Sequence, residues 1–154
     1  MLSNPGALVF GTVAVAALLT AENAQRETYP ETIGAVLIAL ALYWLAHSYA
    51  DFTGQRLKRA EKLSFAALGR TMVHELWILL GAAIPLLILL VWWAAGSRLT
   101  TALTAAVWAA AVVLGLIEFA AAVRARLSGR ELIAQTSLGL LLGLLVIAMK
   151  IVLH

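Results

Sequence analysis

The sequence predicts an all-α fold, a polytopic bundle of five transmembrane helices that forms a single membrane domain over residues 1–154. Two compositional observations support this: 63% of the 154 residues are hydrophobic and 12% are charged. Soluble domains are about 45–50% apolar and about 25% charged. A bilayer accommodates the excess apolar surface, because helices that face lipid are apolar on their outer sides as well. The third observation is the pattern of apolar runs, which gives five expected spans: 5–21, 32–50, 71–95, 99–123 and 132–153.

The first expected span, residues 5–21, has its own start signals. Ser3 or Asn4 can cap a helix, and Pro5 suits its first turn, where no amide donor is needed. At 17 residues, the helix is about 25 Å long, near the lower limit for a span. No Lys or Arg precedes Arg26, so we interpret this segment as a retained helix. A signal anchor or a cleaved signal peptide is the alternative.

The connection between the second and third spans, residues 51–70, differs from the spans themselves. It mixes basic and apolar residues at near-helical spacing, which predicts a short amphipathic cytoplasmic helix lying on the membrane surface. An ordinary solvated loop is the alternative. Each basic side chain near anionic headgroups contributes about 1 kcal/mol of binding. The residues expected to contact lipid headgroups are Arg56, Lys58, Arg59 and Lys62.

The remaining spans are separated by short connections. The third span contains Pro85, which we expect to kink its helix. It ends near Trp92 and Trp93, a pair typical of an interfacial aromatic belt. A tight turn at Gly96 precedes the fourth span, and a basic loop over residues 124–130 precedes the fifth.

The distribution of Lys and Arg predicts the orientation. Residues 51–70 contain five of them and residues 124–130 contain three, while the opposite side has three. Basic residues favour the cytoplasmic side. The sequence therefore predicts a multi-pass protein of a cell membrane with its N-terminus in the cytoplasm and its C-terminus outside.

Polar residues within the spans are the candidate functional residues. A charged side chain near the bilayer centre costs about 2.5–3.5 kcal/mol, so such residues are functional candidates by default. The expected orientation places six of them, from four helices, in the cytoplasmic third: His47, Asp51, His74, Glu75, Glu118 and Gln135. Polar residues are also tolerated near helix ends for structural reasons, which is the alternative for each of them.

Two of these residues, His47 and Asp51, are four positions apart and share one helix face. A neighbouring carboxylate would favour the charged imidazole, so the spacing suits proton relay or metal binding. His74 and Glu75 point about 100° apart on a helix. At most one of that pair is therefore expected to join His47.

Glu118 is the deepest acidic candidate. Its helical neighbours Ala111, Gly115 and Ala122 are small, so we expect the carboxylate to face the bundle rather than lipid. In that position the Glu118 carboxylate could bind a cation or carry a proton. The structural alternative pairs it with a cytoplasmic arginine such as Arg124.

A small-residue motif on the fifth span, Gly139-x-x-x-Gly143, predicts a close helix contact. The partner is another helix of this chain or a second copy. Gly115 on the fourth span is a further expected packing position.

Several function classes lack any sequence support. The net charge is +3, and most of the basic residues lie in two short loops. They do not alternate with aromatic residues as in a groove that binds nucleic acid, so we expect no nucleic-acid partner. Cysteine is absent, which excludes thiolate chemistry. There is no phosphate loop, nucleophile elbow or HExxH motif. We therefore do not expect an enzyme.

The expected function is a channel or transporter for cations or protons that uses the cytoplasmic polar residues. Five helices are few for an internal pathway, so we expect a homo-oligomer. One alternative is a non-transporting scaffold or accessory subunit bound to membrane lipids. The other is a haem or metal protein with His47 and His74 as ligands. The sequence does not indicate a cofactor or a metal.

Overall fold

The computed structural model describes residues 4–22, 27–59 and 64–153. The regular structure in these residues is entirely helical, which confirms the all-α prediction. The helices are α1 (Pro5–Ala21), α2 (Tyr29–Arg59), α3 (Phe65–His74), α4 (Trp77–Ala94), α5 (Leu99–Arg124) and α6 (Gly129–Leu153).

Four segments of the described chain are long and apolar enough to cross a membrane. They are Tyr29–Lys58, Phe65–Ala94, Leu99–Arg124 and Gly129–Val152. The first helix, α1, is apolar but shorter. Asn4 caps it as expected, because its side chain accepts a hydrogen bond from the Ala7 amide at 3.0 Å. The whole is an all-α bundle of apolar helices.

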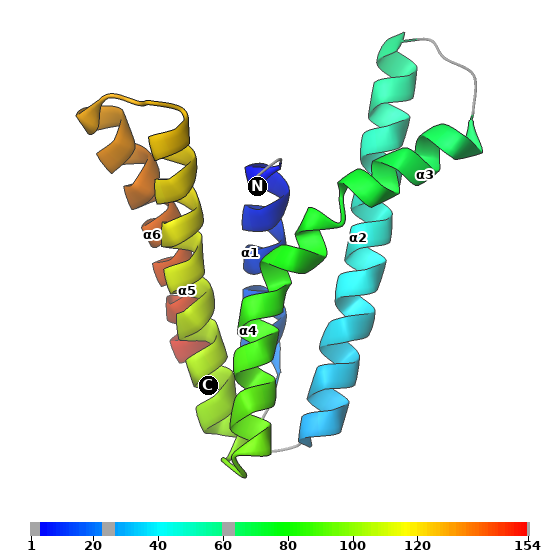
Figure 1. Cartoon of the computed structure of the whole chain (residues 1–154). Coiled ribbons are helices and arrows are strands. Elements are labelled where there is room, and N and C mark those ends of the chain that lie inside the picture. The colour runs from blue at the N-terminus through cyan, green and yellow to red at the C-terminus, as the bar shows by residue number, and fades with distance from the viewer. Residues whose placement is uncertain (1–3, 23–26, 60–63, 154) are drawn as a thin grey trace.

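The connection between the second and third predicted spans differs from the prediction. Residues 51–59 continue α2, so this stretch is a projecting helix end rather than a separate surface helix. The later residues form α3, which Ser64 caps by accepting a bond from the Ala67 amide. In Figure 1, α3 runs obliquely from α2 towards α4. The boundary between α2 and α3 includes residues 60–63, which lie outside the described part.

The third predicted span also differs in where it is interrupted. The helix breaks at Glu75 and Leu76, between α3 and α4, whereas Pro85 stays inside α4. The break is a tightened turn, since the Leu76 amide bonds the Val73 carbonyl and the Ile78 amide bonds the Glu75 carbonyl. Hydrogen bonds between residues three apart are those of a 3₁₀ turn, which is tighter than a turn of α-helix. The chain changes direction between α3 and α4 at this turn (Figure 1).

The first helix occupies the centre of the bundle. α1 packs against α2, α4, α5 and α6, and α5 and α6 form a closely packed hairpin (Figure 1). The N-terminus, the α5–α6 turn and the end of α2 lie at one end of the bundle, here called the Asn4 end. The end of α1, the α4–α5 turn and the end of α6 lie at the other, here called the Lys150 end.

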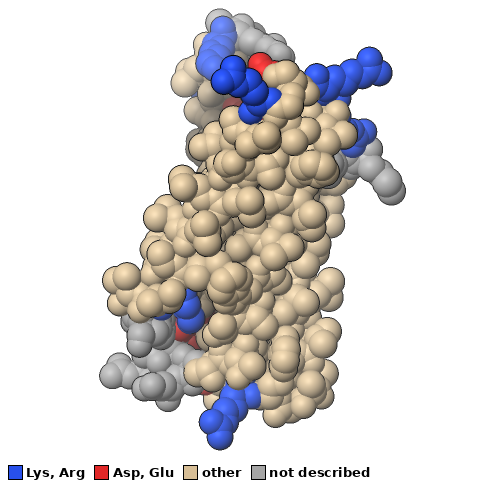
Figure 2. Space-filling model, turned by 90° about the vertical axis from the view of Figure 1, so that its left-hand side faces the viewer, with Lys and Arg blue, Asp and Glu red and all other residues tan. Residues whose placement is uncertain are grey.

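The space between the two ends is filled by aliphatic side chains. Leu19 of α1, Leu89 of α4 and Leu103 of α5 are fully buried there, and aliphatic residues of α2 and α6 are buried beside them. Large hydrophobic side chains also cover the outside, as Leu138 and Val152 illustrate. On the face drawn in Figure 2, charged side chains gather at both ends of the molecule and leave an uncharged band between them. This is the distribution that a lipid environment requires.

Candidate functional site

A buried acid, Glu75, lies in the turn between α3 and α4. Its backbone amide bonds the Thr71 carbonyl at 2.9 Å, which fixes the residue at the end of α3. The side chain is 7% exposed. Its Oε1 accepts a hydrogen bond from the Asn4 Nδ2 at 3.4 Å, and its Oε2 lies 3.7 Å from the His47 Nε2. Three separate parts of the chain therefore meet at this carboxyl.

His47 lies on α2 between Glu75 and the surface. Its side chain is 36% exposed, and its ring centroid is 5.1 Å from that of Phe10 and 6.4 Å from that of Tyr43. The Phe10 and Tyr43 rings also stack on each other at 5.2 Å. These aromatic contacts orient the imidazole so that Nε2 faces Glu75. We call His47 and Glu75 the His47–Glu75 pair.

Chemically, the His47–Glu75 pair can bind one proton. A protonated imidazole would form an ion pair with the carboxylate, and a protonated Glu75 could donate to a neutral imidazole. At 3.7 Å the contact is too long for a hydrogen bond. Transfer between the two groups therefore needs a small side-chain rotation or a bridging water.

A second polar pair lies between α5 and α6. Gln135 Nε2 donates to Glu118 Oε2 at 2.9 Å, and both side chains are half-buried. They line a hollow of about 220 Å³ together with residues of α1 and α5: Pro5, Gly6, Val9, Ile117 and Ala121. The bond satisfies the carboxylate without Arg124, which is exposed at the end of α5.

The six predicted residues are thus divided between two pairs, the partly exposed Asp51 and the exposed His74. The start of α1 separates the pairs, because Asn4 contacts Glu75 while Pro5 and Gly6 line the hollow beside Glu118. Asp51 accepts a bond from Gln55 at 2.7 Å on the projecting end of α2. His74 is exposed at the end of α3. The pairing of Glu75, rather than His74, agrees with the expectation that only one of the two faces His47.

Asn4 is a neighbour of the buried acid that the sequence does not predict. The sequence indicates only a helix cap at that position, and the Asn4 side chain does cap α1 through its oxygen. Its amide nitrogen is then left to bond Glu75, which is 71 residues away in the chain. Phe10 and Tyr43 were missed for the same reason, since an aromatic residue on an apolar helix gives no signal of its own.

The predicted glycine contacts occur within the chain. A Cβ at Gly143 would lie 2.8 Å from the Ala111 Cβ, and one at Gly139 would lie 2.6 Å from the Glu118 Cγ. A Cβ at Gly115 would lie 2.9 Å from the Leu140 Cδ2. The α5–α6 contact therefore uses this small-residue face, and the homo-oligomer remains a prediction without support from this motif.

The basic residues expected at lipid headgroups lie mainly on the projecting end of α2. Lys58 is exposed and Arg56 is partly exposed. The Arg59 side chain and all of Lys62 are outside the described part of the chain. Arg70 is exposed on α3, where its Nε donates to the Ala66 carbonyl at 3.4 Å.

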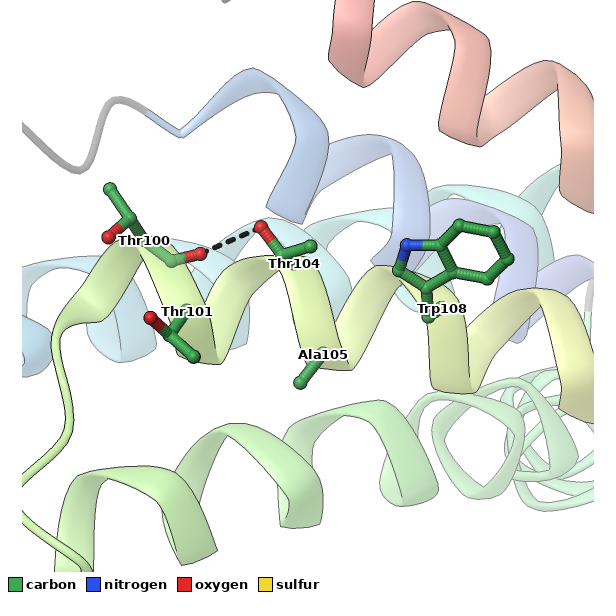
Figure 3. A pocket seen from close by; sticks show the side chains of 5 residues that line it. All are labelled: Thr100, Thr101, Thr104, Ala105 and Trp108. Carbon is green, nitrogen blue, oxygen red and sulfur yellow. Dashed lines mark hydrogen bonds between the residues drawn. The ribbon is translucent and has the colours of Figure 1, made fainter.

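Two further features of the described residues concern ligand binding. Within the described residues, no three His, Cys, Asp or Glu side chains lie close enough together to bind a metal ion. A hollow of about 410 Å³ lies on α5, lined by Thr100, Thr101, Thr104, Ala105 and Trp108 (Figure 3). It has no titratable lining residue, and the Thr104 hydroxyl donates to the Thr100 carbonyl of its own helix at 2.8 Å.

Comparison with protein-family models, with curated proteins and with solved structures found no match for this chain.

Proposed function

We propose that this chain is a multi-pass protein of a cell membrane that conducts or transports protons or small cations, using the His47–Glu75 pair as its binding site. The observation that supports this proposal is the burial of the Glu75 carboxyl beside a titratable imidazole. An ionisable side chain at such a position costs stability, so its presence favours a functional role. By the charge distribution, the Asn4 end faces the cytoplasm.

The contacts of Glu75 suit reversible proton binding. The Asn4 amide can donate to the carboxyl in either protonation state, because each state keeps an acceptor oxygen. His47 is more exposed than Glu75, so a proton from the cytoplasm would reach the imidazole first. Glu118, a half-buried acid bonded to Gln135 at the same end, would serve as a further cation or proton site.

A route across the rest of the bilayer is the most demanding part of this proposal. The core of one chain, around Leu19, Leu89 and Leu103, is aliphatic and fully buried. A polar pathway through that core would need groups that these residues lack. The proposal therefore includes assembly of several copies, with the pathway beyond Glu75 running between them.

The same aliphatic core favours a second candidate, a scaffold or accessory membrane subunit that transports nothing. In that case, the His47–Glu75 and Glu118–Gln135 pairs would only join helices. The haem or metal alternative has less support, because the His47 Nε2 faces Glu75 and His74 is exposed.

Ion flux into liposomes separates the two candidates. The purified protein would be reconstituted, and flux of protons and of several cations measured from about pH 5 to 8, where histidine titrates. Glu75→Gln and His47→Gln should each lower the flux steeply, and His47→Gln should also flatten its pH dependence. His74→Gln is the matched control, since it makes the same change at an exposed position.

Thermal unfolding of each variant shows whether the fold is retained. Loss of flux in a variant with wild-type stability supports transport. Wild-type liposomes that pass no ion at any pH in this range would rule out the transport proposal and leave the scaffold candidate.

A further inference from the structure

A hollow of about 560 Å³ lies between α2 and α3, apart from the two pairs described above. Only one of its six lining residues, Tyr49, has a hydroxyl, amide or charged group in its side chain. A lining of this composition suits an apolar ligand. The hollow, here called the α2–α3 hollow, is lined by Leu42, Leu45, Ala46 and Tyr49 of α2 and by Leu68 and Met72 of α3.

Polar contacts hold α2 and α3 in the arrangement that forms this hollow. The Trp44 Nε1 of α2 donates to the Met72 carbonyl of α3 at 3.1 Å. The His47–Glu75 pair joins α2 to the turn that follows α3. The α2 residues of the lining are exposed on the outside of the molecule. In a bilayer, the α2–α3 hollow therefore opens towards acyl chains rather than towards water.

The α2–α3 hollow lies near the membrane interface at the Asn4 end. Tyr49 directly precedes residue 50, where the expected span ends, and α2 ends at the Asn4 end (Figure 1). Leu42 and Leu45 are further from that end along the helix. Tyrosine is common at the level of the headgroups, because its ring is apolar and its hydroxyl is polar. The lining thus passes from hydrocarbon depth to headgroup level.

A basic residue follows on the same face of α2. Arg56 is partly exposed and comes seven residues after Tyr49, which is about two turns, or about 10 Å, further along the helix. Within the described part of α2, the nearest acid is Asp51, which lies about 140° around the helix from Arg56. Asp51 accepts a bond from Gln55 at 2.7 Å on that other side. The apolar hollow is therefore continued by a positive charge at the interface.

We propose that the α2–α3 hollow binds an anionic phospholipid, with one acyl chain in the hollow and the phosphate at Arg56. A guanidinium binds phosphate oxygens through two parallel hydrogen bonds, and the long arginine side chain can reach back towards the membrane. The Tyr49 hydroxyl lies between these two parts and can donate to an ester or phosphate oxygen. A second copy of the chain fits less well, because an apolar helix would bring no anion to Arg56. The proposal requires a membrane location but not ion transport.

Native mass spectrometry of the purified protein tests the headgroup contact. Phosphatidylglycerol and phosphatidylcholine with identical acyl chains would be added separately, and the wild type should retain phosphatidylglycerol in preference. Arg56→Gln should weaken phosphatidylglycerol binding about fivefold, the usual contribution of one basic residue at anionic headgroups. Lys58→Gln is the matched control, since it removes the same charge at an exposed position about 160° around α2 from Arg56. That variant should retain phosphatidylglycerol as the wild type does.

Filling the α2–α3 hollow tests the acyl-chain contact. Ala46→Trp places a large ring in the hollow and should lower the retention of both lipids. Ala134→Trp is the matched control, because Ala134 is exposed on α6 near the same end of the bundle and does not line the hollow. Added phosphatidylglycerol should raise the unfolding temperature of the wild type and of Ala134→Trp. It should not raise that of Ala46→Trp, whose unfolding without added lipid shows whether the variant is folded.

Photo-crosslinking locates the lipid on the wild type without any substitution. Phosphatidylglycerol with a photoreactive group in one acyl chain should crosslink mainly to Leu42–Tyr49 of α2 and to Leu68 and Met72 of α3. Crosslinks spread evenly over all the helices would overturn the proposal. Equal weakening by Arg56→Gln and Lys58→Gln would do so as well, and so would a lipid-free dimer that Ala46→Trp dissociates. Absence of ion flux would leave the proposal intact.

Discussion

Gly11 on α1 and Gly81 on α4 each lie against the backbone of the other helix. A Cβ on Gly11 would overlap the Ile78 carbonyl, and a Cβ on Gly81 would overlap the Leu8 carbonyl. Beside them, the Thr12 hydroxyl lies 2.9 Å from both the Leu8 and the Gly81 carbonyl oxygens. The α1–α4 contact thus depends on two positions without side chains and one small hydroxyl.

Gly11→Ala should therefore destabilise the protein by at least about 1–3 kcal/mol, since the added methyl meets fixed backbone rather than a flexible side chain. Gly34→Ala is the matched control in α2, where a Cβ would have no neighbour within 4 Å. There the change should be neutral or stabilising by up to about 1 kcal/mol through helix propensity. Denaturant unfolding in mixed micelles measures both. Equal effects of the two substitutions would contradict the close α1–α4 contact.

The Glu118–Gln135 bond gives a second prediction. Gln135→Leu removes the donor to a half-buried carboxylate and should cost about 1–3 kcal/mol. Glu118→Gln keeps a hydrogen-bonding partner for Gln135 and should cost less than about 1 kcal/mol. The double variant Glu118→Leu/Gln135→Leu removes both partners and should recover much of the stability lost in Gln135→Leu. Additive losses in this cycle would mean that the two side chains do not interact.

Membrane orientation is tested by single cysteines at Ser97 and Ser128. The former lies in the α4–α5 turn and the latter in the α5–α6 turn, at opposite ends of the bundle. A membrane-impermeant thiol reagent added to intact cells should label position 97 and not position 128, because basic loops favour the cytoplasmic side of a membrane. Labelling of position 128 from outside would contradict the predicted orientation. It would mean that the His47–Glu75 pair lies at the outer face of the membrane.

Much of the fold follows from the sequence because lipid makes the apolar runs conspicuous. The boundaries were harder to predict. Basic residues such as Arg56 and Lys58 predict a separate surface helix after a span that ends at residue 50. A helix can also continue into water with such side chains exposed, and α2 does so as far as Arg59. The third span contains a break at Glu75 and Leu76 that the sequence does not predict, while Pro85 lies inside the continuous helix α4. At the break, the backbone satisfies its hydrogen bonds through a tightened turn.

The sequence predicts that His47, Glu75, Glu118 and Gln135 lie at one end of the bundle, but not how they are arranged there. The two pairs do share one end, beside the start of α1. Depth along the membrane normal does not determine which way each helix faces. The position of α1 between the two pairs, and with it the Asn4–Glu75 contact, depends on packing among helices that are distant in the chain.

The central place of α1 has a consequence for biogenesis. α1 precedes the surrounding helices in the chain and is therefore synthesised before them. Until they are present, its buried hydroxyls need no hydrogen-bond partner on another helix. Thr12 can bond the Leu8 carbonyl at 2.9 Å and Thr20 bonds the Ala16 carbonyl at 2.7 Å, both within α1. When α4 is inserted, Thr12 can also reach Gly81. α1 can thus act as the template on which the nascent chain assembles in the order of its translation.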